Sequence, residues 1–222
     1  MELWHGSQKI IETPQLGLGK IHNDYGQGFY CTESLDLARE WACSRDADGF
    51  VNRYELDIAD LKVLDLLSPQ YCVLHWIALL VEHRSFRKDT AIAAGACEYL
   101  HDHFLPQTST CDVIRGWRAD DSYFSYARAF VNNTITVDQL GRSMRLGNLG
   151  EQIVLKSERA FKSIRFAGFE RAQQALYGPL AKERDEAARA QYRELLAENP
   201  FEGIRIVDII REEMTGDDPR LQ

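Results

Sequence analysis

Short β-prone runs alternate with helical segments of uneven length over the first 155 residues. The runs expected as strands lie at residues 3–5, 28–32, 49–56, 61–66, 111–116 and 151–155. Apolar residues at helical spacing, several behind a Ser, Thr or Asp that can cap a helix, predict helices over 34–42, 71–82, 123–130 and from 136. Because the strands are not joined by regular strand–helix–strand units, we predict an α+β fold rather than a doubly wound sheet.

The character of the chain changes after about residue 169. Residues 170–198 are rich in Ala, Glu, Arg and Leu and predict a helix interrupted at Gly178–Pro179. The segment 204–210 is either a strand or a short buried helix, since its apolar pattern fits both. We therefore expect a mixed domain over residues 1–168 and a helical extension, residues 169–222, packed on it.

Composition narrows the class of protein. A chain of 222 residues with 45% hydrophobic residues can bury a sizeable core. With 26 Lys and Arg against 34 Asp and Glu, its net charge of −8 disfavours general binding to duplex nucleic acid. The sequence shows no signal-peptide pattern, no apolar run of membrane-spanning length and no Cys-x-x-Cys pair among five cysteines. We expect a cytoplasmic protein without a membrane segment.

Two other patterns are weak. Cys97, His101, His103 and Cys111 lack the paired spacing of structural zinc sites, so we expect no metal site. The glycine-rich stretch 17–20 contains a lysine but lacks phosphate-loop spacing. Neither pattern supports a function.

Three separated motifs carry the functional argument. They are Leu3-Trp-His-Gly-Ser7, Tyr25-Gly-Gln-Gly-Phe-Tyr-Cys-Thr32 with Trp41 on the helix that follows, and Glu151-Gln-Ile-Val-Leu155. Taken singly, such aromatic residues and a strand histidine are ordinarily core residues, and a glutamate at the start of a strand is ordinarily exposed. The functional interpretation depends on the three motifs occurring together and in this order.

Together the motifs resemble those of the histidine–tyrosine–glutamate class of NAD-dependent ADP-ribosyltransferases, which includes diphtheria toxin and the poly(ADP-ribose) polymerases. The polymerases have Leu-Trp-His-Gly-Ser, then Phe-Gly-Lys-Gly-Ile-Tyr-Phe-Ala, then Glu-Tyr-Ile-Val. The chain is more closely similar to a bacterial family of unknown function with His-Gly-Ser, then Asp-Phe-Gly-Lys-Gly-Phe-Tyr. That family also has an aspartate-bearing strand before Ala-Asp-Asp, as at 112–116 and 119–121 here. The similarity covers roughly residues 1–165.

The resemblance implies a role for each motif residue. Glu151 would stabilise the oxocarbenium-like sugar that forms when the bond between nicotinamide and ribose breaks. Tyr30 and Trp41 would form aromatic walls for the nicotinamide ring. His5 would donate a hydrogen bond to the adenosine ribose, and the backbone of Gly6 would hold the carboxamide.

Further residues are expected at the same site. Ser7 and Gln152 belong to the implied NAD-binding motifs, and Arg115 and Arg118 are candidates for contacts with the NAD phosphates. Since side chains alternate along a strand, only one of Glu151 and Gln152 can face the cleft. The sequence leaves open which of the two does so.

The implied fold is a split pair of small sheets with the NAD cleft between them, flanked by helices. The implied function is that of a mono-ADP-ribosyltransferase that uses NAD as a substrate to modify a macromolecule. Related domains often occur in loci resembling toxin–antitoxin pairs, so a toxin or effector with a protein antitoxin is expected. The alternatives are an NAD glycohydrolase and a catalytically weak NAD- or ADP-ribose-binding module that acts through a protein partner.

Overall fold

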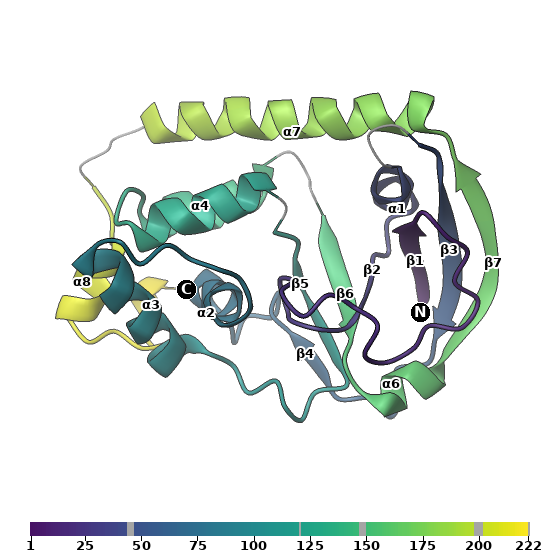
Figure 1. The fold of residues 1–222 in the computed structure, drawn as a ribbon. Helices are drawn as coiled ribbons and strands as arrows, with labels where there is room; N and C mark the ends of the chain where they lie inside the picture. Colours follow the sequence, from purple (N-terminus) through teal and green to yellow (C-terminus); the bar gives the residue numbers. More distant parts are fainter. Residues whose placement is uncertain (44–46, 120, 147–149, 198–201, 222) are drawn as a thin grey trace.

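The fold combines two small β-sheets with helices that flank them, in a computed structural model of the chain (Figure 1). This confirms the predicted α+β class. The structure describes residues 1–43, 47–119, 121–146, 150–197 and 202–221, with only the backbone described at 121–123.

The first sheet has three antiparallel strands in the order β1 (Glu2–Ser7), β3 (Gly49–Leu56) and β7 (Ile164–Ala172). β7 was not expected from the sequence. It continues past residue 168, the expected end of the first domain, and pairs with β3 as far as Ala172. The chain therefore completes this sheet before the helical extension begins.

The second sheet has four strands in the order β2 (Phe29–Cys31), β6 (Glu151–Leu155), β5 (Val113–Trp117) and β4 (Val63–Asp65). It meets the first sheet at a β-bridge between Trp4 and Thr32. There the backbone N–H of Trp4 donates to the carbonyl of Thr32 at 2.8 Å, and the N–H of Thr32 donates back at 2.9 Å. Beyond this bridge the sheets diverge.

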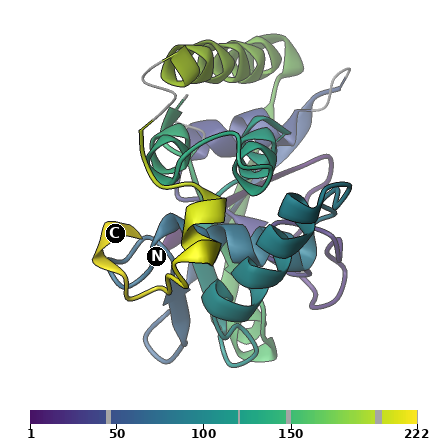
Figure 2. The same cartoon turned by 90° about the vertical axis from the view of Figure 1, so that its left-hand side faces the viewer.

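Helices cover both sheets. α1 (Leu35–Ala42), capped by Ser34, packs on β1. α2 (Val73–His83), α3 (Ala91–Phe104), α4 (Asp121–Val131) and α5 (Val137–Ser143) form a helical body beside the second sheet, and α6 (Glu158–Ser163) precedes β7. Figure 2 shows α8 (Ile206–Arg211) against α3. The short 3₁₀ helix Pro219–Leu221 follows α8 in the chain. The main core centres on α2, whose Leu74, Trp76 and Ile77 are fully buried.

α7 (Gln174–Ala197) runs along one side of the molecule, from α1 to α4 (Figure 1). The predicted interruption at Gly178–Pro179 is wrong, because the helix continues through Pro179. Proline removes the donor for the carbonyl of Ala175, but both residues are exposed, so water can satisfy that carbonyl. The ambiguous segment 204–210 forms α8 and buries Ile206 and Ile209 on one face.

No helix in the described parts of the chain combines the length and apolar character needed to cross a membrane. The five cysteines are all free thiols.

Candidate functional site

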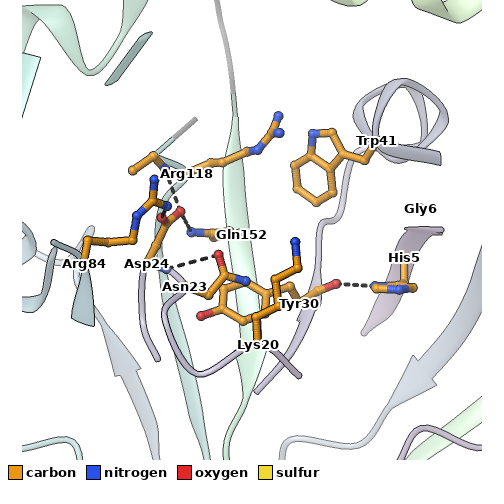
Figure 3. A pocket seen from close by; sticks show the side chains of 11 residues that line it. His5, Gly6, Lys20, Asn23, Asp24, Tyr30, Trp41, Arg84, Arg118 and Gln152 are labelled. Carbon is orange, nitrogen blue, oxygen red and sulfur yellow. Dashed lines mark hydrogen bonds and ion pairs between the residues drawn. The ribbon is translucent and has the colours of Figure 1, made fainter. Parts of the chain in front are cut away.

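A pocket of about 510 Å³ opens where the two sheets diverge. Its walls come from β1, the loop before β2, β2 itself, α1, the C-terminal end of α2, the loop after β5, and β6. The side chains converge from these separate elements (Figure 3). The lining residues are His5, Gly6, Lys20, Asn23, Asp24, Tyr30, Trp41, Arg84, Arg118, Ala119 and Gln152.

His5 is held in one orientation by β2. Its Nδ1 lies 2.6 Å from the carbonyl oxygen of Tyr30, and its ring stacks on Phe29 with centroids 4.4 Å apart. A carbonyl only accepts, so Nδ1 carries the proton. Burial lowers the pKa of His5, which leaves Nε2 as an acceptor in the neutral ring. His5 would therefore accept a hydrogen bond from a hydroxyl, whereas the sequence led us to expect a donor.

Gly6 offers backbone groups to the pocket. Trp4 directs its N–H and C=O away from β3, toward Thr32. Because these groups alternate along a strand, Gly6 directs its own N–H and C=O to the same edge, where the sheets have separated. A Cβ at Gly6 would lie 2.2 Å from the carbonyl oxygen of Ala38 and 2.5 Å from the N of Ala42. Glycine is thus required by the close packing of β1 on α1.

Tyr30 and Trp41 supply aromatic surface. The hydroxyl of Tyr30 donates to the carbonyl of Gly26 at 2.6 Å and accepts from the N–H of Tyr25 at 3.1 Å, so its ring serves as a wall. Trp41 projects from α1, and the guanidinium of Arg118 lies over its ring, 4.7 Å from the centroid. Its Nε1 is buried and has no hydrogen-bond partner within the described residues.

Gln152, rather than Glu151, faces the pocket. Gln152 is buried at 4% exposure and lines the cavity. Glu151, the expected catalytic carboxylate, is on the opposite face of β6 and does not line this pocket. Its Oε2 accepts from Arg115 at 2.7 Å, and it lines a separate depression with residues of the α1 N-terminus. The alternation of side chains along β6 separates the two groups.

The carboxylate in the pocket belongs to Asp24, which the sequence analysis did not select. It is 3% exposed and accepts hydrogen bonds from Arg84, Gln152 and the backbone N–H of Ala119. Burial raises the pKa of Asp24, and these hydrogen bonds and the charge of Arg84 oppose that effect. One feature of the sequence could have pointed to Asp24: it directly precedes Tyr25, at the position where the similar bacterial family has an aspartate.

Three cationic side chains line the pocket: Lys20, Arg84 and Arg118. Arg84 is paired with Asp24 at 2.6 Å, and Arg118 lies over Trp41. Arg118, one of the two candidates for contacts with the NAD phosphates, therefore lines the pocket. Arg115 instead holds Glu151 outside the pocket. Lys20 ends the glycine-rich stretch 17–20 that the sequence analysis set aside, and nothing in the local sequence distinguished Arg84 from an ordinary surface cation.

One further expected residue, Ser7, does not line the pocket, and its hydroxyl bonds the backbone of Lys9. In the Ala-Asp-Asp pattern at 119–121, Asp120 and the side chain of Asp121 are outside the described residues. Within the described chain, no group of three or more His, Cys, Asp or Glu residues is placed to hold a metal ion.

Comparison with protein families finds a match to the first three quarters of the chain. Residues 1–166 match the model of a family described as protein of unknown function (DUF3990), and this segment contains every residue that lines the pocket. No curated protein and no solved structure matches the chain. The match ends within β7, before α7 begins. The chain therefore belongs to the DUF3990 family.

Proposed function

We propose that this protein is a mono-ADP-ribosyltransferase that binds NAD in the pocket between the two sheets. One observation carries the proposal: His5, Gly6, Tyr30, Trp41 and Gln152, from three separated motifs, line a single pocket. Motif residues that merely filled the core would have no reason to meet at a solvent-accessible cavity.

The lining chemistry matches the parts of NAD. The nicotinamide ring would lie against Tyr30, and its carboxamide would pair with the N–H and C=O of Gly6. A ribose hydroxyl would donate to Nε2 of His5. The diphosphate would meet positive charge from Lys20 and Arg118. The nicotinamide ring, its carboxamide, a ribose hydroxyl and the diphosphate would thus each have a complementary partner in the pocket.

The reaction breaks the bond between nicotinamide and ribose, and positive charge develops on the sugar. The amide oxygen of Gln152 would accept a hydrogen bond from a ribose hydroxyl and place a negative dipole beside that charge. The acceptor nucleophile then forms the new bond to the sugar carbon and loses its proton. We propose a macromolecule as the acceptor, as for an intracellular toxin or effector with a protein antitoxin; water as acceptor would give an NAD glycohydrolase.

A second function is favoured by the identity of Gln152. An amide dipole stabilises a developing cation less than a full carboxylate charge does. A protein that binds NAD or ADP-ribose without cleaving it, and acts through a partner, would suit such a pocket. The two functions share the ligand and differ in nicotinamide release.

The test is NAD titration by calorimetry together with nicotinamide release, with and without cell lysate as a source of acceptor. The variants are Gln152→Ala and, as a control, Gln70→Ala at an exposed site outside the pocket. Release that is lost in Gln152→Ala and kept in Gln70→Ala supports the transferase. Binding without release under all conditions supports the binding module. Absence of NAD binding contradicts both.

A further inference from the structure

Asp24 gathers three donors from separate parts of the fold. Its Oδ1 accepts from Arg84 of the α2 C-cap at 2.6 Å. Its Oδ2 accepts from the N–H of Ala119, after β5, and from Nε2 of Gln152 on β6, both at 2.9 Å (Figure 3). The Asp24 side chain is 3% exposed, so its carboxylate is buried in the pocket wall, where it links the end of α2, the segment after β5, and β6.

Only a carboxylate can satisfy all three donors. Asparagine has the same shape but offers one acceptor and one donor. If its oxygen faced Ala119 and Gln152, its amide nitrogen would face the guanidinium of Arg84. If it were turned over, the nitrogen would face Ala119 and Gln152. The charge of Asp24 is therefore tied to this arrangement of donors.

The side-chain amide of Gln152 has a defined orientation for the same reason. Its Nε2 lies between two acceptors, Asp24 Oδ2 at 2.9 Å and the carbonyl of Trp117 at 3.2 Å. An amide oxygen in that position would face two other oxygens. The oxygen Oε1 is consequently turned away from both and toward the pocket that Gln152 lines.

We propose that Asp24 is a positioning residue that fixes the Gln152 amide with its oxygen toward the ligand. The pocket then recognises a ligand that presents a hydroxyl or N–H donor at this point, such as a sugar hydroxyl. The identity of that ligand as NAD rests on the proposed function, whereas the coupling between Asp24 and Gln152 does not.

The coupling between Asp24 and Gln152 can be tested without a ligand, by measuring how the stability of the variant Gln152→Glu depends on pH. The new carboxylate would lie against Asp24, so one of the two must hold a proton, and the pair would have a raised pKa in the folded state. Folding then takes up a proton, and stability is lost as pH rises from about 4 toward that pKa. We expect the loss in melting temperature, relative to wild type, to be at least about 4 °C larger at pH 8 than at pH 5.5.

Adding Asp24→Asn to Gln152→Glu should remove this difference between the two pH values. The charged and titratable groups near the pair are His5, Lys20, Tyr25, Tyr30, Arg84 and Arg118. Burial raises the pKa values of both tyrosines, and the lysine and guanidinium groups keep their charge, so these five do not change between pH 5.5 and 8. His5 can gain a proton at the lower end of this range, but it does so in wild type as well, and in the double variant, so the comparison with both of them removes its contribution. An unchanged pH dependence in Gln152→Glu overturns the proposal.

A measurement on the wild type covers the case in which the variants fail to fold. In protein labelled with ¹⁵N-glutamine, the side-chain protons of Gln152, bonded to Asp24 and Trp117, should exchange with water at least about 10-fold more slowly than those of exposed Gln70. Equal exchange rates would show that the amide is not held and would overturn the proposal.

The effect of Asp24 on ligand binding is tested with NAD as the probe. We expect Asp24→Asn to weaken NAD binding at least about 10-fold in folded protein, while Asp60→Asn, at an exposed site, changes it less than about 3-fold. Wild-type affinity in Asp24→Asn overturns the positioning role. If wild-type protein does not bind NAD, the proposed function fails, and the pH and exchange measurements still decide the coupling of Asp24 and Gln152.

Discussion

At the scale of single residues, protonation state decides what the pocket can recognise. His5 donates from Nδ1 to Tyr30, and burial lowers its pKa, so the neutral ring presents Nε2 as an acceptor. Gln152, oriented by Asp24, presents a second acceptor. The pocket thus has two acceptors for hydroxyl groups, beside cations suited to phosphate.

The state of His5 predicts how ligand binding depends on pH. Protonation would turn Nε2 into a donor, and the lowered pKa places this change below the ordinary value of about 6.5. We expect NAD affinity to be constant from pH 8 to about 6.5 and to fall at lower pH, as measured by calorimetric titration. Affinity that rises on acidification would show that Nε2 donates.

The placement of Glu151 gives a second prediction at this scale. Because its carboxylate is bound to Arg115 outside the pocket, Glu151→Gln should change NAD affinity less than about 3-fold. Gln152→Ala should weaken binding about 10-fold, through loss of a buried hydrogen bond. Titration of both variants checks this, and a larger effect at Glu151 than at Gln152 would refute the assignment of faces on β6.

At the scale of elements, the pocket depends on the close approach of β1 to α1. Gly6 allows the strand to contact the helix backbone at Ala38 and Ala42, which places Trp41 opposite the strand edge. The glycine in the His-Gly-Ser motif therefore has a packing role in addition to any contact with a ligand.

Gly6→Ala is expected to lower the free energy of unfolding by about 2–3 kcal/mol, because the added Cβ would overlap backbone atoms of α1. Thermal or denaturant unfolding measures the loss. Gly95→Ala, inside α3 with open space around the new Cβ, is the matched control and should be neutral or stabilising by up to about 1 kcal/mol. Equal stability of Gly6→Ala and wild type would contradict the packing argument.

At the scale of the whole molecule, α7 connects α1, which packs on the first sheet, to α4 in the helical body. Arg184 pairs with the buried Glu40 of α1 at 2.8 Å. Farther along α7, the carbonyl of Ala188 accepts from Tyr126 of α4 at 3.3 Å, and Tyr192 packs against the same ring. α7 thereby fixes the helix that carries Trp41 relative to the helical body, although it lies outside the family match.

Arg184→Met is expected to destabilise the protein by about 3 kcal/mol, because Glu40 would remain buried without this partner. Denaturant unfolding measures the change. The double variant Glu40→Gln with Arg184→Met should recover part of the loss, since no buried charge is left uncompensated. If the double variant is less stable than the single variant, the charge of Glu40 is not the cause.

The sequence by itself determined the α+β class, the boundaries of β3 and β6, and the three motifs, because these follow from local periodicity, capping residues and short patterns. It did not predict β7. The segment that contains Ile164, Phe166 and Phe169 forms a strand because it pairs with β3, which lies far away in the sequence. The continuity of α7 through Pro179 likewise followed from solvent exposure rather than from residue type.

Only the tertiary structure decided the composition of the site. Alternation along β6 required that Glu151 and Gln152 face opposite ways, but the burial of one face against Asp24 selected Gln152. Arg84 and Asp24 join the pocket through contacts between residues far apart in the chain, 60 positions for Asp24 and Arg84 and 128 for Asp24 and Gln152. Such contacts depend on how sheets and helices pack, and no local pattern in the chain encodes them.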